Sequence, residues 1–212
     1  SSGHLVIIQK ILKINSPGNL IEVSAHLGTL LSIILIFKKE IWGIITSLKS
    51  SESKKYIFMI VLATLPSVVF VLTSKSFIIR LFESVSSVAI ALIFTGCILY
   101  MSGIKYYSNK KLSLAKGFLI GISQAFAIIP GISRSGMTIS IALLLGVSSK
   151  EAAKFSFMLA VPAIFGATIL TFLDAQFDQL KIMTTPLVVT ALVSFVSGLL
   201  ALKFLIKILN AG

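Results

Sequence analysis

Five long apolar runs limit what this chain can fold into more than any other feature of its sequence. Each run is close to the roughly 20 residues that a helix needs to cross a bilayer. A soluble bundle of five such helices would have almost no polar surface to place in water. The sequence therefore predicts an all-α integral membrane protein whose spans are residues 20–37, 56–73, 85–103, 155–173 and 186–208.

The composition agrees with this prediction and argues against a nucleic-acid partner. Only 12% of the 212 residues are charged, which is about half the share in a soluble domain. The net charge of +12 comes from Lys and Arg residues that lie mostly between the apolar runs, as in cytoplasmic loops that face anionic lipid. We therefore expect membrane lipids and no nucleic acid among the partners. Cys97 is the only cysteine, and no His or Cys spacing typical of a metal site is present, so the sequence names no metal ligand.

The charges between the runs predict the topology. Loop 38–55 carries five lysines against two glutamates, and loop 105–116 carries four lysines and no acidic residue. Two runs separate these loops, so both lie on one side, and the positive-inside rule makes that side the cytoplasm. Loops 74–84 and 174–185 then lie outside. We expect a multi-pass membrane protein.

Two further segments are too short for simple spans, and one of them is interrupted by Pro, Gly, Ser and Arg. Short broken helices at membrane depth are tolerated where they line a cavity. We interpret residues 1–14 and 117–147 as re-entrant helical hairpins that enter from opposite sides. This arrangement predicts one membrane domain, a helical bundle of two inverted repeats (1–104 and 105–212), with a site between the repeats near the midplane.

Residues 130–136 carry the clearest chemistry. Arg134 is one of only two arginines, and a charge at membrane depth indicates a functional site because it is costly there. A helix that begins in this segment presents free N–H groups and the positive end of its dipole to an anion, and the Arg fork fits phosphate oxygens. The alternative is an ordinary loop whose Arg reaches the lipid headgroups. We predict an anion cradle formed by Ser133, Arg134, Ser135, Gly136 and Thr138.

Ser1 and His4 are the second group of candidates. They are three residues apart and share one face of a helix, and a Ser beside a His is the minimum pair for an activated nucleophile. The His could also attack phosphorus or protonate a leaving oxygen. The alternative is a capping serine and an interface histidine. Their role depends on whether the fold places them against Arg134. Glu22 and His26, four apart in one span, are interpreted as a supporting pair.

Residues 124–139, QAFAIIPGISRSGMTI, resemble the signature of the undecaprenyl-diphosphatase family associated with bacitracin resistance. Residues 153–162, AKFSFMLAVP, and residues 1–5, SSGHL, resemble further motifs of that family. The resemblance extends over nearly the whole chain. It implies hydrolysis of undecaprenyl diphosphate to the monophosphate and inorganic phosphate, in a protein with inverted repeats and two re-entrant hairpins.

Carried over by position, the resemblance implies a role for each candidate. Ser1 matches a nucleophile, His4 a catalytic histidine and Arg134 a phosphate-binding arginine, with Ser133 and Thr138 as hydroxyl partners. A divalent cation, Mg or Ca, is also implied. The family's glutamate pair lies upstream of the string at which this chain begins, so we expect the metal ligands in a missing N-terminal segment, and a final helix also to be missing. We expect this chain to retain the anion-binding cradle better than it retains catalytic activity.

Two functions remain open at this stage. In the first, the cradle and a metal neutralise a polyprenyl diphosphate, and Ser1 or a water attacks while His4 acts as acid or base. The alternative is a transporter or flippase of a phosphorylated lipid, because inverted repeats and broken helices occur in that class too. Phosphate release by the purified protein in detergent separates the two. A homodimer is left open.

Overall fold

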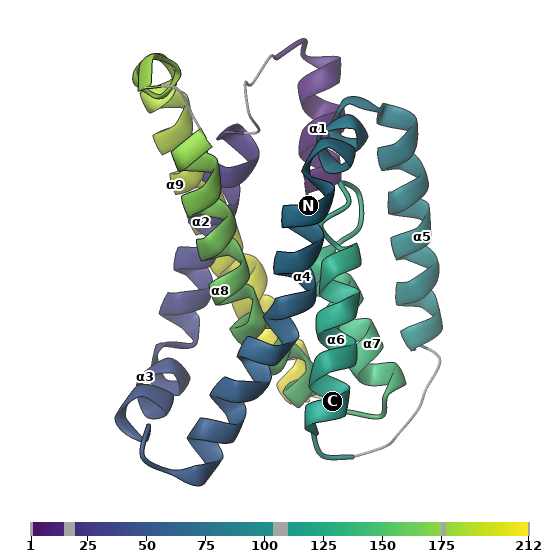
Figure 1. Ribbon diagram of the computed structural model, residues 1–212, viewed down its shortest axis with the longest axis vertical. Coiled ribbons are helices and arrows are strands. Elements are labelled where there is room, and N and C mark those ends of the chain that lie inside the picture. The colour runs from purple at the N-terminus through teal and green to yellow at the C-terminus, as the bar shows by residue number, and fades with distance from the viewer. Residues whose placement is uncertain (1, 15–19, 104–109, 175–176, 212) are drawn as a thin grey trace. The chain divides into compact units, whose positions relative to one another are not determined.

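The computed structural model describes residues 2–14, 20–103, 110–174 and 177–211, and the regular structure in these residues is entirely helical (Figure 1). The helices, in chain order, are α1 (Ser2–Ile11), α2 (Leu20–Ile36), α3 (Lys38–Thr46), α4 (Ser51–Glu83), α5 (Val85–Gly103), α6 (Leu114–Phe126), α7 (Arg134–Leu144), α8 (Ser149–Asp174) and α9 (Phe177–Ala211).

Helix length and composition confirm the membrane prediction. Among the described residues, α4, α5, α8 and α9 each contain a stretch that is long and apolar enough to cross a bilayer. Helices α2 and α3 pass the same test only together, and a bend of 69° separates them. Four of the five predicted runs therefore lie in helices that pass this test alone, and the run 20–37 corresponds to α2 and Phe37. The chain is an all-α, multi-pass membrane protein.

Several helices continue beyond the apolar runs. Three segments that were predicted to be loops are therefore helical over much of their length. Residues 38–55 contain α3 and the start of α4, and residues 174–185 contain the start of α9. Helix α4 continues through residues 74–83, and its backbone leaves helical geometry only at Ser74 (φ −122°, ψ 19°). Lys, Glu and Gln are good helix formers, so polar residues mark the end of an apolar stretch without ending the helix. The side assigned to each segment stays a prediction.

The second predicted hairpin is present as two short helices. Helices α6 and α7 run side by side in opposite directions (Figure 1). The two ends of the hairpin also meet, because the N–H of Lys110 donates to the carbonyl of Gly146 at 3.0 Å. Its re-entrance into the bilayer stays a prediction. The hairpin predicted for residues 1–14 is not confirmed, since the described residues of that segment form one helix followed by a turn.

The chain divides into two compact units. One comprises Ser1–Ile14 and Lys55–Leu159, and the other comprises Asn15–Lys54 and Ala160–Gly212. Each unit combines segments from both halves of the chain. The division into inverted repeats 1–104 and 105–212 stays a prediction.

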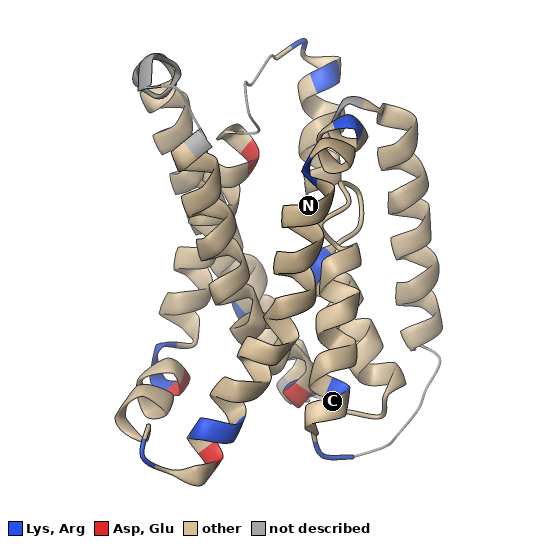
Figure 2. Ribbon diagram, viewed as in Figure 1, with Lys and Arg blue, Asp and Glu red and all other residues tan. Residues whose placement is uncertain are grey.

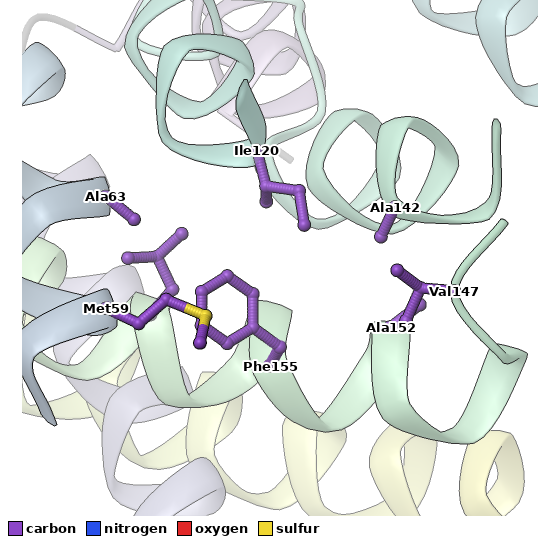
Figure 3. Close-up of a cluster of buried hydrophobic side chains, with 8 residues drawn as sticks. Met59, Ala63, Ile120, Ala142, Val147, Ala152 and Phe155 are labelled. Carbon is purple, nitrogen blue, oxygen red and sulfur yellow. The ribbon is translucent and has the colours of Figure 1, made fainter. Parts of the chain in front are cut away.

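In the first unit, a buried apolar cluster holds the α6–α7 hairpin against α4 and α8. Figure 3 shows the ring of Phe155 beside Met59, with Ile120 pointing toward them. Gly121 allows α6 to approach α4 closely, because a Cβ at this position would collide with the carbonyl of Ala63. The cluster comprises Met59, Ala63, Ile120, Ala142, Val147, Ala152, Phe155 and Leu159. It packs α7, the helix that carries the predicted cradle, against α8 through Ala142.

In the second unit, α2 packs closely on α9 through small residues spaced four apart. The hydroxyl of Ser24 donates to the carbonyl of Leu187, and that of Ser32 donates to the carbonyl of Phe195 at 2.8 Å. Between them, a Cβ on Gly28 would collide with the backbone of α9. Small residues and interhelical hydrogen bonds are what hold helices together in lipid, where apolar burial gives little driving force.

Candidate phosphate site at the start of α7

The first turn of α7 has free backbone donors. Ser133 is the N-cap, with φ −71° and ψ 113°, and its hydroxyl accepts from the N–H of Gly136 at 3.2 Å. The N–H of Met137 donates to the carbonyl of Ser133 at 2.8 Å. Within the described part of the chain, the N–H groups of Arg134 and Ser135 have no hydrogen-bond partner. Such groups, with the helix dipole behind them, form a ready site for an anion.

The side chain of Arg134 keeps most of its hydrogen-bonding capacity. It is partly buried, and Nη1 donates to the carbonyl of Ser156 at 3.4 Å. No carboxylate pairs with it among the residues that the structure describes. A guanidinium has five N–H donors and keeps its positive charge in proteins. One long contact to a carbonyl leaves the charge without a counterion, so an anionic ligand fits here.

Gly131 allows the turn before Arg134 to approach α5. Its φ is +101°, a conformation that residues with a Cβ rarely adopt. A Cβ at this position would also collide with the carbonyl of Val88 on α5. Backbone conformation and space therefore both require glycine here.

Thr95 of α5 connects the two ends of this turn, and the sequence analysis missed it. Its side chain is 4% exposed. The hydroxyl accepts from the N–H of Ser133 at 3.2 Å and lies 3.3 Å from the carbonyl of Gly131, to which it can donate. The same hydroxyl also lies 2.9 Å from the carbonyl of Ala91 in its own helix. Thr95 thereby holds the residues that precede Arg134. Its only sequence signal is a hydroxyl inside an apolar run.

Thr138 and Ser156 support the first turn of α7 from the side. Both are fully buried and share a hydrogen bond between their hydroxyls. The Thr138 hydroxyl also donates to the carbonyl of Arg134 at 2.9 Å. In this arrangement Thr138 and Ser156 tie the turn that carries Arg134 to α8. Direct contact between Thr138 and a substrate stays a prediction, as does substrate binding by Ser133, Ser135 and Gly136.

The N-terminal motif meets the turn of the cradle. Gly3 is buried, and a Cβ built on it would lie 2.6 Å from the Cα of Gly131 and 3.2 Å from a methyl group of Val88. His4, the next residue of α1, is exposed. The structure thus brings the two motifs into contact through their glycines. Ser1 lies outside the described residues, and its role and that of His4 stay predictions.

The described residues offer no ready metal site. Within them, no three His, Cys, Asp or Glu side chains lie close enough together to hold an ion. Glu22 and His26 belong to α2 in the second unit, where Glu22 is 4% exposed and each has polar or electrostatic partners. The supporting role predicted for this pair is not tested by its placement.

Comparisons with known proteins show the family to which the chain belongs. The family model of bacitracin resistance protein BacA matches residues 1–212. The undecaprenyl-diphosphatase of Carboxydothermus hydrogenoformans is 37% identical over 218 residues, which cover 100% of this chain and 82% of the relative. That of Rhodopirellula baltica is 39% identical over 212 residues, with 98% and 80% covered. That of Korarchaeum cryptofilum is 35% identical over 225 residues, with 100% and 84% covered. These matches confirm the resemblance carried by the motifs, and the chain belongs to the family of bacitracin resistance protein BacA.

Proposed function

We propose that this protein hydrolyses undecaprenyl diphosphate to undecaprenyl phosphate and inorganic phosphate. One observation carries the proposal: the charged side chain of Arg134 has no counterion among the described residues and lies beside free N–H groups at the start of α7. Relatives that match the chain over its whole length have names stating this activity. The reaction returns the lipid carrier to the form that cell-wall synthesis uses, which fits the bacitracin-resistance family.

The cradle would act by binding and positioning the diphosphate. Phosphoryl transfer needs little covalent help from a protein and depends mostly on orientation and charge stabilisation. The Arg134 fork can hold two phosphate oxygens, while the N–H groups of Arg134 and Ser135 donate to a third. Thr95 and Ser156 keep this turn in place without touching the substrate. The prenyl chain would remain among the apolar helices.

The chemical step belongs to the N-terminal motif in this proposal. Ser1 or a water attacks the terminal phosphorus, and the bond from that phosphorus to the bridging oxygen breaks. Undecaprenyl phosphate leaves with the bridging oxygen, and His4 supplies or accepts the proton. With a water nucleophile, inorganic phosphate forms at once. With Ser1, a phosphoserine forms first and a water then releases the phosphate.

A divalent cation, Mg or Ca, is part of the proposal only as a cofactor expected from the resemblance. Because the described residues do not hold three suitable ligands together, no step above depends on it. When bound, such an ion would neutralise phosphate oxygens. Chelation followed by addition of Mg or Ca would test the requirement, since full activity in excess chelator contradicts it.

Localisation and oligomeric state complete the proposal. We place the protein in the bacterial inner membrane, with segments 38–55 and 105–116 on the cytoplasmic side, as the positive-inside rule suggests. Fractionation that finds the tagged protein in the outer membrane would contradict this. We also propose that the protein can form a homodimer. The mass of the detergent-solubilised protein tests this, and a monomer mass would contradict it.

The sharpest test compares the two arginines of the chain. Arg134→Ala should lower phosphate release from undecaprenyl diphosphate about 100-fold or more, because loss of a transition-state donor costs roughly 3 kcal/mol. Arg80→Ala, at an exposed position in the last turn of α4, is the matched control and should leave release unchanged. Binding of inorganic pyrophosphate, measured on the same variants, distinguishes an effect on phosphate binding from an effect on the catalytic step. Equal binding and equal turnover in both variants would contradict the proposal.

The transporter alternative is not favoured, and the same assay distinguishes it from hydrolysis. Detergent micelles have no second compartment, so phosphate release there requires hydrolysis. A protein that binds pyrophosphate through Arg134 but releases no phosphate under any condition would support the transporter alternative.

A further inference from the structure

Helix α3 leaves the direction of the preceding span. It bends away from α2 by 69° at Phe37, which is 7% exposed and has non-helical φ and ψ of −97° and 19°. Membrane helices tilt on average about 20° from the bilayer normal. Whatever the direction of such a tilt, a bend of this size places α3 closer to the membrane plane than to the normal. Helix α3 therefore does not continue the span.

One face of α3 is apolar, and the protein covers it only in part, since Ile41 and Ile44 are half-buried and Ile45 is exposed. Ile41, Ile44 and Ile45 follow the spacing of one helical face, and Lys39 lies on the opposite side. No described residue of α3 is buried. The exposed fractions of Trp42 and Ile45 are 67% and 50%. A helix of this kind needs an external apolar surface to cover it.

The charges of α3 indicate the nature of that surface. Lys38 and Lys39 are exposed in the first turn, where positive charge opposes the helix dipole. Helix stability does not explain them, so an external anion is the better explanation. Lys49 and Lys54 follow nearby, and Figure 2 shows basic residues at both ends of α3. The positive-inside rule predicts that these same lysines lie on the cytoplasmic side.

We propose that α3 lies in the headgroup region of the cytoplasmic leaflet and binds anionic lipids. The isoleucine face rests on the acyl chains, Trp42 lies at headgroup depth as interfacial tryptophans do, and Lys38 and Lys39 contact lipid phosphates. Helices with one apolar and one polar face occupy this depth, and a basic cluster next to a span attracts the anionic leaflet. The proposed partner of α3 is the lipid surface. This inference does not depend on the proposed catalytic activity.

The single tryptophan of the chain makes the proposal directly testable. Trp42 is the only Trp, so the fluorescence of the purified protein in lipid nanodiscs reports on α3 alone, and Trp42→Phe provides the blank. Phosphatidylcholine brominated near the headgroup should quench Trp42 about twofold more than lipid brominated near the chain end. Stronger quenching by the deep bromines would overturn the proposal in favour of a broken span. Quenching only by an aqueous quencher such as acrylamide would place α3 in water and would also overturn it.

A charge-matched pair of variants tests the anionic preference. Replacing part of the phosphatidylcholine with phosphatidylglycerol should shift Trp42 emission to shorter wavelength in the native protein. The shift should be lost in Lys38→Gln/Lys39→Gln and kept in Lys203→Gln/Lys207→Gln, which removes two exposed lysines from α9. Equal shifts in both pairs would contradict the role of Lys38 and Lys39. A signal that depends on the number of protein copies per nanodisc would instead show that a second copy covers α3.

Discussion

Gly3 and Gly131 pack backbone against backbone, since a Cβ on Gly3 would lie 2.6 Å from the Cα of Gly131. This contact joins the residue before His4 to the turn before Arg134. The two motifs are far apart in the chain, and each by itself has an ordinary explanation. Their contact is the structural reason to treat them as parts of one site.

Gly131→Ala should disturb both the turn and the contact with α1. The substitution strains a φ of +101° and introduces a clash with α5, and overpacking of this kind costs about 1–3 kcal/mol. We expect a lower Tm in detergent and a loss of pyrophosphate binding. Gly96→Ala is the matched control, because a Cβ at Gly96 meets nothing within 4 Å. Identical Tm and identical pyrophosphate binding in both variants would show that neither stability nor binding requires the conformation of this turn.

Thr95→Val should loosen the turn while leaving the helix intact. The valine keeps the volume but cannot accept from the N–H of Ser133, and such a bond contributes about 0.5–1.5 kcal/mol. We expect pyrophosphate binding and kcat/KM to fall up to about tenfold, which is the equivalent of 1.4 kcal/mol. Thr95→Ser keeps the hydroxyl and should restore most of the loss.

The control for Thr95 is Thr64→Val on α4, whose hydroxyl donates, within the described residues, to the carbonyl of Ile60 in its own helix at 2.8 Å. It should leave binding unchanged. A Thr95→Ser variant as impaired as Thr95→Val would attribute the effect to packing and contradict the positioning role.

Thr138 and Ser156 should behave as a coupled pair. Thr138→Val leaves the buried hydroxyl of Ser156 without its partner, which costs about 1–3 kcal/mol. Ser156→Ala should cost less, because the Thr138 hydroxyl keeps its hydrogen bond to the carbonyl of Arg134. The double variant should lose less than the two single losses combined, with a coupling of about 0.5–3 kcal/mol. Thermal unfolding of all four proteins measures this coupling. Simple additivity would mean that the hydrogen bond between the hydroxyls contributes nothing.

Gly28→Val should weaken the packing of α2 on α9. The side chain would collide with the carbonyl of Ala191, and α2 would have to move away from α9. We expect a clear fall in Tm, whereas Gly166→Val on α8, where a Cβ meets nothing within 4 Å, should change it much less. Similar shifts for both would indicate that the loss of glycine, and not the collision, is responsible.

The membrane spans and the start of α7 beside Arg134 could be predicted from the sequence because both depend on local patterns. Crossing a bilayer requires about 20 apolar residues in succession, and such runs are visible without knowledge of neighbours. A Ser N-cap followed by Arg, Ser and Gly is likewise a local signal for a helix start that can bind an anion. The ends of the helices were less predictable, because Lys and Glu at the membrane boundary extend helices such as α4 and α9.

Only the tertiary structure decided which distant residues support the cradle. The hydrogen bond between Ser133 and Thr95 joins residues 38 positions apart, and the sequence does not show which face of α5 meets the turn. A threonine in an apolar run looks the same whether it faces lipid or a neighbouring helix. Arg134 was therefore identified by its own chemistry, whereas Thr95, Ser156 and the Gly3–Gly131 contact follow from how the helices pack.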